Sequence, residues 1–167
     1  MEGKRGKIIK WSLIGILLLI IIIQFIPVKK DNPPSATEIK WDSPQTRSLA
    51  RRACYDCHSN ETAWPYYSNI APVSWFLSDH VHEGRRHLNF SQWHYPRERE
   101  IRKARSMVRQ VMEGEMPLES YIWMHPEAKL TDIEKQQLIK GIEKTFNVTV
   151  PADSGKTEGS EHEHDED

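Results

Sequence analysis

The chain has few cysteines, and their number excludes several kinds of site. Only Cys54 and Cys57 occur among 167 residues. Because a second C-x-x-C pair is missing, the usual four-ligand zinc site is not predicted. No strand–helix–strand pattern of the kind expected beside a thioredoxin-like pair is visible. A disulfide between the two would close a small, strained ring that adds little stability. The pair therefore needs another explanation.

Other features that the sequence lacks limit the possible fold classes. No segment alternates apolar and polar residues with a period of two, which argues against β-strands. There is no internal repeat. The net charge is −1, and basic residues are concentrated on one predicted helix face only, so nucleic-acid binding is not indicated. We predict an all-α protein, with one small helical domain behind a single N-terminal transmembrane helix.

The two cysteines stand directly before a histidine, in the run Cys54-Tyr55-Asp56-Cys57-His58. C-x-x-C-H is the attachment pattern of c-type haem, because two intervening residues let both thiols reach vinyl groups on one edge of the macrocycle. The following histidine can supply an imidazole nitrogen as the proximal iron ligand. We therefore predict one covalently bound haem c per chain. A haem-free thiol redox pair is the main alternative.

One apolar run fits this prediction, since haem attachment takes place outside the cytoplasm. Ile8–Ile26 contains a single charge, Lys10, and as a helix it is about 28 Å long, enough to cross a membrane. Basic residues precede the run, which favours a cytoplasmic N-terminus and an outside location after Lys29. No small-x-small cleavage site follows, so an uncleaved anchor in the cytoplasmic membrane is predicted, with the haem domain periplasmic or extracellular.

Composition divides the chain into four parts. We predict a membrane anchor over residues 1–28, a linker over 29–39, a haem-binding domain over 40–150 and a disordered acidic tail over 151–167. The tail has seven acidic groups against Lys156 alone and no large apolar side chain, a composition that cannot form a packed core. Its two histidines, His162 and His164, are interpreted as part of this solvated tail.

Two helices are predicted in the first half of the domain. Pro44 suits the first helical position, so a helix over 44–53 is expected, capped by Asp42 or Ser43. It leads directly into the C-x-x-C-H motif. A second, short helix is expected over about 73–81. Three tryptophans could line a haem crevice or belong to the ordinary core: Trp64, Trp75 and Trp93.

Two further helices are predicted in the second half. One follows Pro96 and ends at Gly114, and the last begins with a capping box formed by Thr131 and Glu134. In the last helix Gly141 could let another helix approach closely. Its predicted buried side chains are Ile133, Leu138, Ile139, Ile142 and Phe146. The third helix has a basic face, interpreted as a solvated surface or as a docking site for an acidic redox partner or haem propionates: Arg97, Arg99, Arg102, Lys103, Arg105 and Arg109.

The second axial ligand decides between electron transfer and ligand chemistry. Met116 is the leading candidate, because Pro117 fixes its loop and a thioether stabilises Fe(II) and raises the potential. Met124 and His125 are the alternatives. The remaining histidines match no standard zinc spacing and are interpreted as surface or haem-edge residues: His80, His82, His87 and His94.

The run CYDCHSNETAWPYYSNIAPVSW, with GEMP and MHPEAKLT, resembles the small bacterial haem-binding domain family defined by a C-x-x-C-H motif. The resemblance covers roughly residues 40–145, and the order of motifs is also similar to class I cytochrome c. It implies a mainly helical haem domain, often membrane-anchored, with thioether bonds at Cys54 and Cys57, His58 as proximal ligand and Met116 as distal ligand. The segment Leu118–Lys129 is an insertion relative to small cytochromes.

These observations predict a membrane-anchored, extracytoplasmic monohaem c-type cytochrome domain that transfers single electrons, and they favour a carrier over an enzyme. Its expected partners are redox proteins at the membrane surface. The alternative is a peroxidase-like enzyme or a gas or redox sensor, with an open or weakly held distal position and a polar group such as His80, His87 or His125 above the iron.

Overall fold

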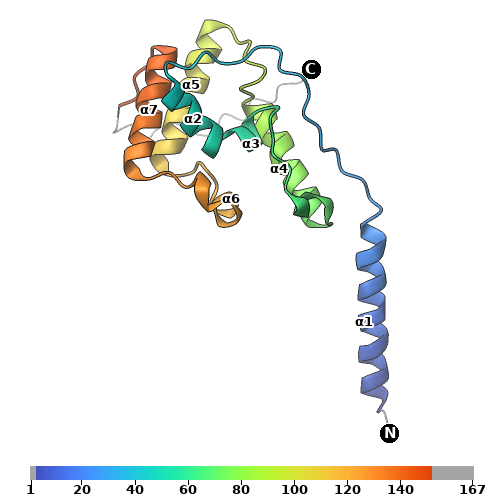
Figure 1. Ribbon diagram of the computed structural model, residues 1–167. Helices are drawn as coiled ribbons and strands as arrows, with labels where there is room; N and C mark the ends of the chain where they lie inside the picture. The colour runs from blue at the N-terminus through green and yellow to red at the C-terminus, as the bar shows by residue number, and fades with distance from the viewer. Residues whose placement is uncertain (1–2, 152–167) are drawn as a thin grey trace. The chain divides into compact units, whose positions relative to one another are not determined.

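The computed structural model describes residues 3–151. They form two compact units: residues 3–39 and 55–93 make up unit 1, and residues 40–54 and 94–151 make up unit 2. All regular elements in these residues are helical, and none is a strand, which confirms the predicted all-α class (Figure 1).

Unit 1 contains α1 (Lys4–Ile23), α3 (Tyr55–His58), the 3-10 helix η1 (Tyr66–Asn69) and α4 (Val73–His87). Unit 2 contains α2 (Pro44–Ala53), α5 (Arg97–Glu113), α6 (Glu119–Met124), η2 (Pro126–Ala128) and α7 (Asp132–Phe146). The predicted acidic tail lies outside the described residues from position 152 onward.

Helix α1 is long and apolar enough to cross a membrane, with a mean hydropathy of 2.3. It ends at Ile23 rather than at the predicted Ile26. The reason is Pro27, because a proline disfavours helical backbone at the residue before it and helices commonly end upstream of it. The helix also begins earlier than predicted, at Lys4, since the basic residues before the apolar run are good helix formers.

In unit 1, helix α4 is longer than the predicted segment and continues to His87. The extra turns are polar, so hydrophobic periodicity gave no sign of them. The last turn of α4 contains Arg85, Arg86 and His87. Basic residues at a helix C-terminus interact favourably with the helix dipole and so stabilise this end. Residues that precede the motif also join this unit: Ala36 donates its backbone N–H to Ser91, and Trp93 donates to Thr37.

In unit 2, the buried faces of α2, α5 and α7 form a helical core. As predicted, Ser43 caps α2 by accepting a hydrogen bond from Thr46 N, and Gly114 ends α5 in the left-handed region, with φ of 76°. The core side chains include Leu49, Ala50, Ala53, Ala104, Val108, Val111, Leu138, Ile142 and Phe146. The prediction that Ile133 is buried is wrong, because it is 70% exposed. It lies five positions before Leu138, which places it about 140° away around the helix.

Helices α2 and α7 approach each other closely at Gly141, as its sequence position suggested. A Cβ atom on Gly141 would lie 2.1 Å from Thr46 Oγ1 and 2.5 Å from its Cγ2. Thr46 is 3% exposed, and its hydroxyl donates to Asp42 at 2.6 Å. The absence of a side chain at position 141 therefore lets a fixed, hydrogen-bonded threonine of α2 pack against the backbone of α7.

The capping box of α7 gives a first testable prediction. Thr131 Oγ1 accepts from Glu134 N, and a Glu134 carboxylate oxygen accepts from Thr131 N at 2.9 Å. Thr131→Ala removes the first of these bonds and is expected to lower the free energy of unfolding by about 1 kcal/mol. Denaturant unfolding measures this, with Thr149→Ala, an exposed threonine beyond the helix, as the matched control. Equal stability of the two variants would contradict a stabilising cap.

Candidate functional site

The C-x-x-C-H motif begins where α2 stops. Cys54 is the C-terminal cap residue of α2 and donates its N–H to Ala50 O at 2.8 Å. The next four residues form the one-turn helix α3 of unit 1. Both cysteines are partly buried and neither is in a disulfide. The local chain thus presents two thiols and the following imidazole within five consecutive residues.

His58 is held in a single orientation by the C-terminal part of α4. Its Nδ1 lies 2.9 Å from Gly84 O and 3.2 Å from Leu88 O. Both partners are carbonyl oxygens and can only accept, so Nδ1 carries the proton and Nε2 keeps its lone pair. Burial lowers the pKa of His58, against the opposing effect of these two hydrogen bonds. His58 is therefore a neutral imidazole with Nε2 available as a donor to a metal, the arrangement that metal-bound histidines adopt.

Gly84 brings α4 against the motif. A Cβ atom at this position would lie 2.5 Å from Cys57 O and 3.1 Å from the carbonyl carbon of Cys57. Only a glycine at position 84 lets α4 come this close to the backbone of Cys57. The carbonyl oxygen of Gly84 is also the nearer of the two acceptors for His58 Nδ1. Gly84 was not among the predicted site residues, because it lies beyond the helix predicted over about 73–81, and only a glycine inside a helical stretch would have indicated a close approach.

Aromatic packing supports the same short helix from another side. Tyr55 and Phe90 are each 2% exposed, and their ring centroids lie 5.2 Å apart. The Phe90 ring is also 6.1 Å from the His58 ring, and Phe90 N donates to His58 O at 2.8 Å. Phe90 was not among the predicted site residues. It fixes both the backbone and the ring of His58.

The segment after His58 is fixed by buried polar side chains. Ser59 Oγ donates to Tyr55 O at 2.7 Å, and Asn60 N donates to Ser91 Oγ at 3.0 Å. Asn89 Nδ2 donates to Asn60 Oδ1 at 2.9 Å. All four polar residues are buried, and each bond is therefore worth more than it would be in water. The loop that leaves the motif is rigid because its polar groups are satisfied internally.

Arg85, next to Gly84, joins three chain segments. Its Nε donates to Ser59 O, Nη1 to Asp31 O, and Nη2 to both Asn32 Oδ1 and Thr62 Oγ1, each at 2.8 Å. The guanidinium is thus occupied by protein acceptors around its whole edge. Its role is to hold the segment after α1 and the segment after the motif together in unit 1.

Burial raises the pKa of the Cys57 thiol to about 11, with the neighbouring Asp56 charge adding to the effect and Arg85 opposing it. A thiol used in redox exchange has a lowered pKa instead, since the thiolate is the reactive form. Cys57 is consequently a protonated thiol at neutral pH, which disfavours the haem-free redox pair as a use for this motif.

Met116, the leading distal candidate, belongs to unit 2. The loop after α5 is held by Gln110 O, which accepts from Glu115 N at 3.0 Å and from Met116 N at 3.1 Å. The insertion that follows contains α6, which was not predicted. Of the alternatives, Met124 is 54% exposed, and the His125 ring stacks on Tyr121 with centroids 4.4 Å apart. Among residues 3–151, no three His, Cys, Asp or Glu side chains are grouped to hold a metal ion.

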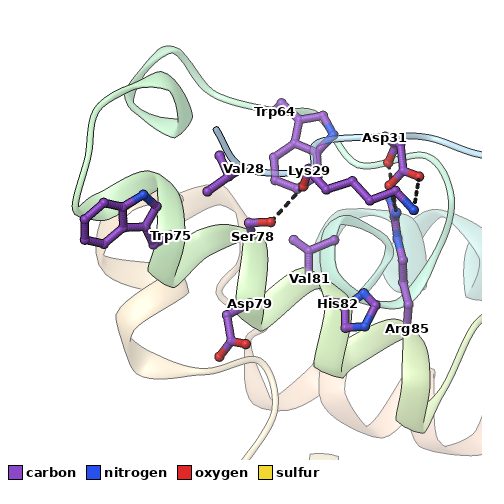
Figure 2. Close-up of a pocket in the computed structure, with 10 residues that line it drawn as sticks. All are labelled: Val28, Lys29, Asp31, Trp64, Trp75, Ser78, Asp79, Val81, His82 and Arg85. Atoms are coloured by element: carbon purple, nitrogen blue, oxygen red, sulfur yellow. Dashed lines mark hydrogen bonds and ion pairs between the residues drawn. The ribbon is translucent and has the colours of Figure 1, made fainter. Parts of the chain in front are cut away.

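A separate cavity of about 370 Å³ lies between α4 and the segment after α1 (Figure 2). Trp64 and Trp75 line it, and Trp93 does not. Its other lining residues are Val28, Lys29, Asp31, Ser78, Asp79, Val81, His82 and Arg85. Neither cysteine nor His58 is among them. Thus two of the three tryptophans predicted as haem-crevice candidates border a cavity that the motif does not reach.

An all-helical domain that orients a histidine nitrogen beside two thiols belongs to the class of haem proteins. The comparison with known families agrees: the family described as haem-binding domain matches residues 18–144, more than half of the chain. The chain belongs to this family, which confirms the predicted family and haem as its cofactor. Searches of curated proteins and of solved structures found no match.

The residues of the motif fit a haem. An iron ligand needs an unprotonated imidazole nitrogen, and the bonds from His58 Nδ1 to Gly84 and Leu88 leave Nε2 in that form. The neighbouring thiols, Cys54 and Cys57, are not consumed by a disulfide.

Proposed function

We propose that this protein is a membrane-anchored, extracytoplasmic c-type cytochrome domain that transfers single electrons. The observation that supports this best is the pair of hydrogen bonds from His58 Nδ1 to Gly84 O and Leu88 O. They prepare an imidazole for iron directly beside two cysteines at haem-attachment spacing. Membership of the haem-binding domain family supplies the cofactor.

In this proposal Cys54 and Cys57 attach one haem covalently. Each Sγ forms a bond to a vinyl carbon, and the thiol proton goes to the other carbon of the same vinyl group. No oxidant and no leaving group is needed. The two bonds would keep the haem on the chain even when the fold opens.

His58 is proposed as the proximal ligand and Met116 as the distal ligand. The bound haem supplies the one-electron couple, and the protein sets its potential through the axial ligands and their surroundings. His58 is held by two carbonyls of unit 1, and the Met116 loop is held by Gln110 O of unit 2. Two protein ligands would leave no coordination site for a substrate, so the protein would be a carrier rather than an enzyme.

Helix α1 is proposed as the anchor, with the N-terminus in the cytoplasm. Diffusion would then be restricted to the membrane surface, where redox proteins are the proposed partners. Basic side chains on α5 support docking to an acidic partner: Arg102, Arg105 and Arg109 are exposed, on the side of the helix away from its buried residues. Complementary charge raises association rates and makes them dependent on salt.

The visible spectrum of the Met116→Ala variant tests the carrier proposal. The wild-type ferric protein is expected to be low-spin, with the weak long-wavelength band of sulfur ligation. Met116→Ala should lose this band, bind carbon monoxide and have a lower reduction potential. Met124→Ala, a substitution at a half-exposed methionine, should change none of these. A wild-type protein that is high-spin or sensitive to carbon monoxide would instead support the enzyme or sensor alternative.

A further inference from the structure

Large apolar side chains are exposed at one corner of unit 1. Tyr66 of η1 is 80% exposed, and Ile70, Val73 and Phe76 around the start of α4 are 50%, 46% and 60% exposed. We call these four residues the apolar corner. Single exposed apolar residues are ordinary. Four within eleven positions form an apolar surface whose exposure to water is unfavourable in free energy. This surface is suited to an apolar partner.

The end of α1 is hydrogen-bonded to the segment that carries the apolar corner. Gln24, which follows the last residue of α1, donates from Nε2 to Ala71 O at 3.1 Å and accepts from Ala71 N at 2.9 Å. Ala71 stands directly after Ile70. Close by in the chain, Lys30 Nζ donates to Asn69 Oδ1. The paired bonds of Gln24 fix Ala71 at the level of the last turn of α1.

If α1 crosses a bilayer, its C-terminal end, with Gln24 and Ala71, lies at the bilayer surface. Twenty residues of helix span about 30 Å, the thickness of the hydrocarbon core. Gln24 therefore lies at the boundary between lipid tails and head groups, and Ala71 lies there with it. Tyrosine and bulky apolar side chains are favoured at this depth. The bonds to Ala71 also explain a glutamine in an apolar run, because they satisfy its amide where little water is available.

We propose that the apolar corner rests in the outer head-group region of the membrane, so that unit 1 contacts lipid through Tyr66, Ile70, Val73 and Phe76. This rests on the proposed anchoring by α1. It follows that unit 1 has a fixed face toward the bilayer and does not move on a free tether. The bonds from Arg85 to Asp31 and Asn32 support this, because they hold the segment after α1 against α4.

The test uses the full haem-loaded chain in lipid discs with a photoactivatable apolar probe dissolved in the lipid. Adducts are then mapped by mass spectrometry. Adducts are expected on α1 and on residues 66–76, several-fold above those on residues 123–133. That second segment is the matched reference, since Trp123, Met124 and Ile133 are 88%, 54% and 70% exposed and have no bond to Gln24. Gln24→Leu should reduce labelling of the apolar corner several-fold and leave α1 labelled, whereas Gln45→Leu, at an exposed glutamine of α2, should change neither.

The outcomes separate this proposal from the proposed function. If α1 is unlabelled, the anchoring itself fails. If α1 is labelled and the apolar corner stays at background, the anchor stands, the lipid contact is wrong and a protein is the occupant to seek. Equal labelling of residues 66–76 and 123–133 would also overturn the proposal, because exposure alone would then account for the adducts.

Discussion

Replacing Cys54 and Cys57 together by serine is expected to leave no haem on the chain after denaturation. Thioether bonds are the only attachment that survives unfolding, and serine forms none. The wild-type chain should keep haem on a denaturing gel, and its intact mass should exceed the chain mass by one haem. In the folded double variant His58 still offers Nε2, so haem that binds without covalent bonds is expected to be lost only on unfolding.

The control for this experiment is Asp56→Asn. It removes a charge between the two cysteines but keeps both thiols, and the amide oxygen can still accept from Ala63 N, which the Asp56 carboxylate does at 2.9 Å. This variant should retain its haem through denaturation. If the wild-type protein itself releases all haem on denaturation, the family membership stands but the c-type attachment is refuted.

Local signals predicted much of the helical framework correctly. Ser43 and Thr131 cap helices as expected, and Gly114 ends one. The two caps depend on side-chain to backbone bonds and the end at Gly114 on its left-handed backbone, all within a few residues, so the local sequence contains the whole interaction. The C-x-x-C-H motif is equally local, and the family match confirms the haem-binding family that the motif indicated. The thioether and ligand roles of its residues stay predictions.

The contacts that orient the site could not be predicted, because they join positions far apart in the chain. Gly84 lies 26 residues after His58, and no periodicity links the two. The same holds for Phe90 and for the bonds of Arg85 to Asp31 and Ser59. Helix α6 was missed for a related reason: a helix of six residues is unstable alone and exists only through tertiary packing. The distal-ligand role of Met116 likewise stays a prediction, because spacing in one sequence does not determine which side chain completes the coordination of an iron.

Gly84→Ala is expected to destabilise the haem domain and to change the electronic environment of the iron. In an open helix this substitution would stabilise by about 1 kcal/mol, since alanine has the higher helix propensity. Here the new Cβ would lie 2.5 Å from Cys57 O, a backbone atom that cannot rotate away. Overpacking of this kind costs about 1–3 kcal/mol, so the sign of the usual effect should reverse and the midpoint of thermal unfolding should fall.

The change in the iron environment follows from the same contact. If α4 moves away from the motif, Gly84 O and Leu88 O move with it, and the hydrogen bonds to His58 Nδ1 lengthen. A weaker bond makes the imidazole a poorer donor to iron, so the reduction potential should rise. Thermal unfolding and redox titration measure the two effects. Gly15→Ala is the matched control, because nothing lies within 4 Å of its added Cβ. It should not lower the midpoint of thermal unfolding and should leave the reduction potential unchanged. An ordinary stabilisation by Gly84→Ala, with an unaltered potential, would show that α4 does not orient His58.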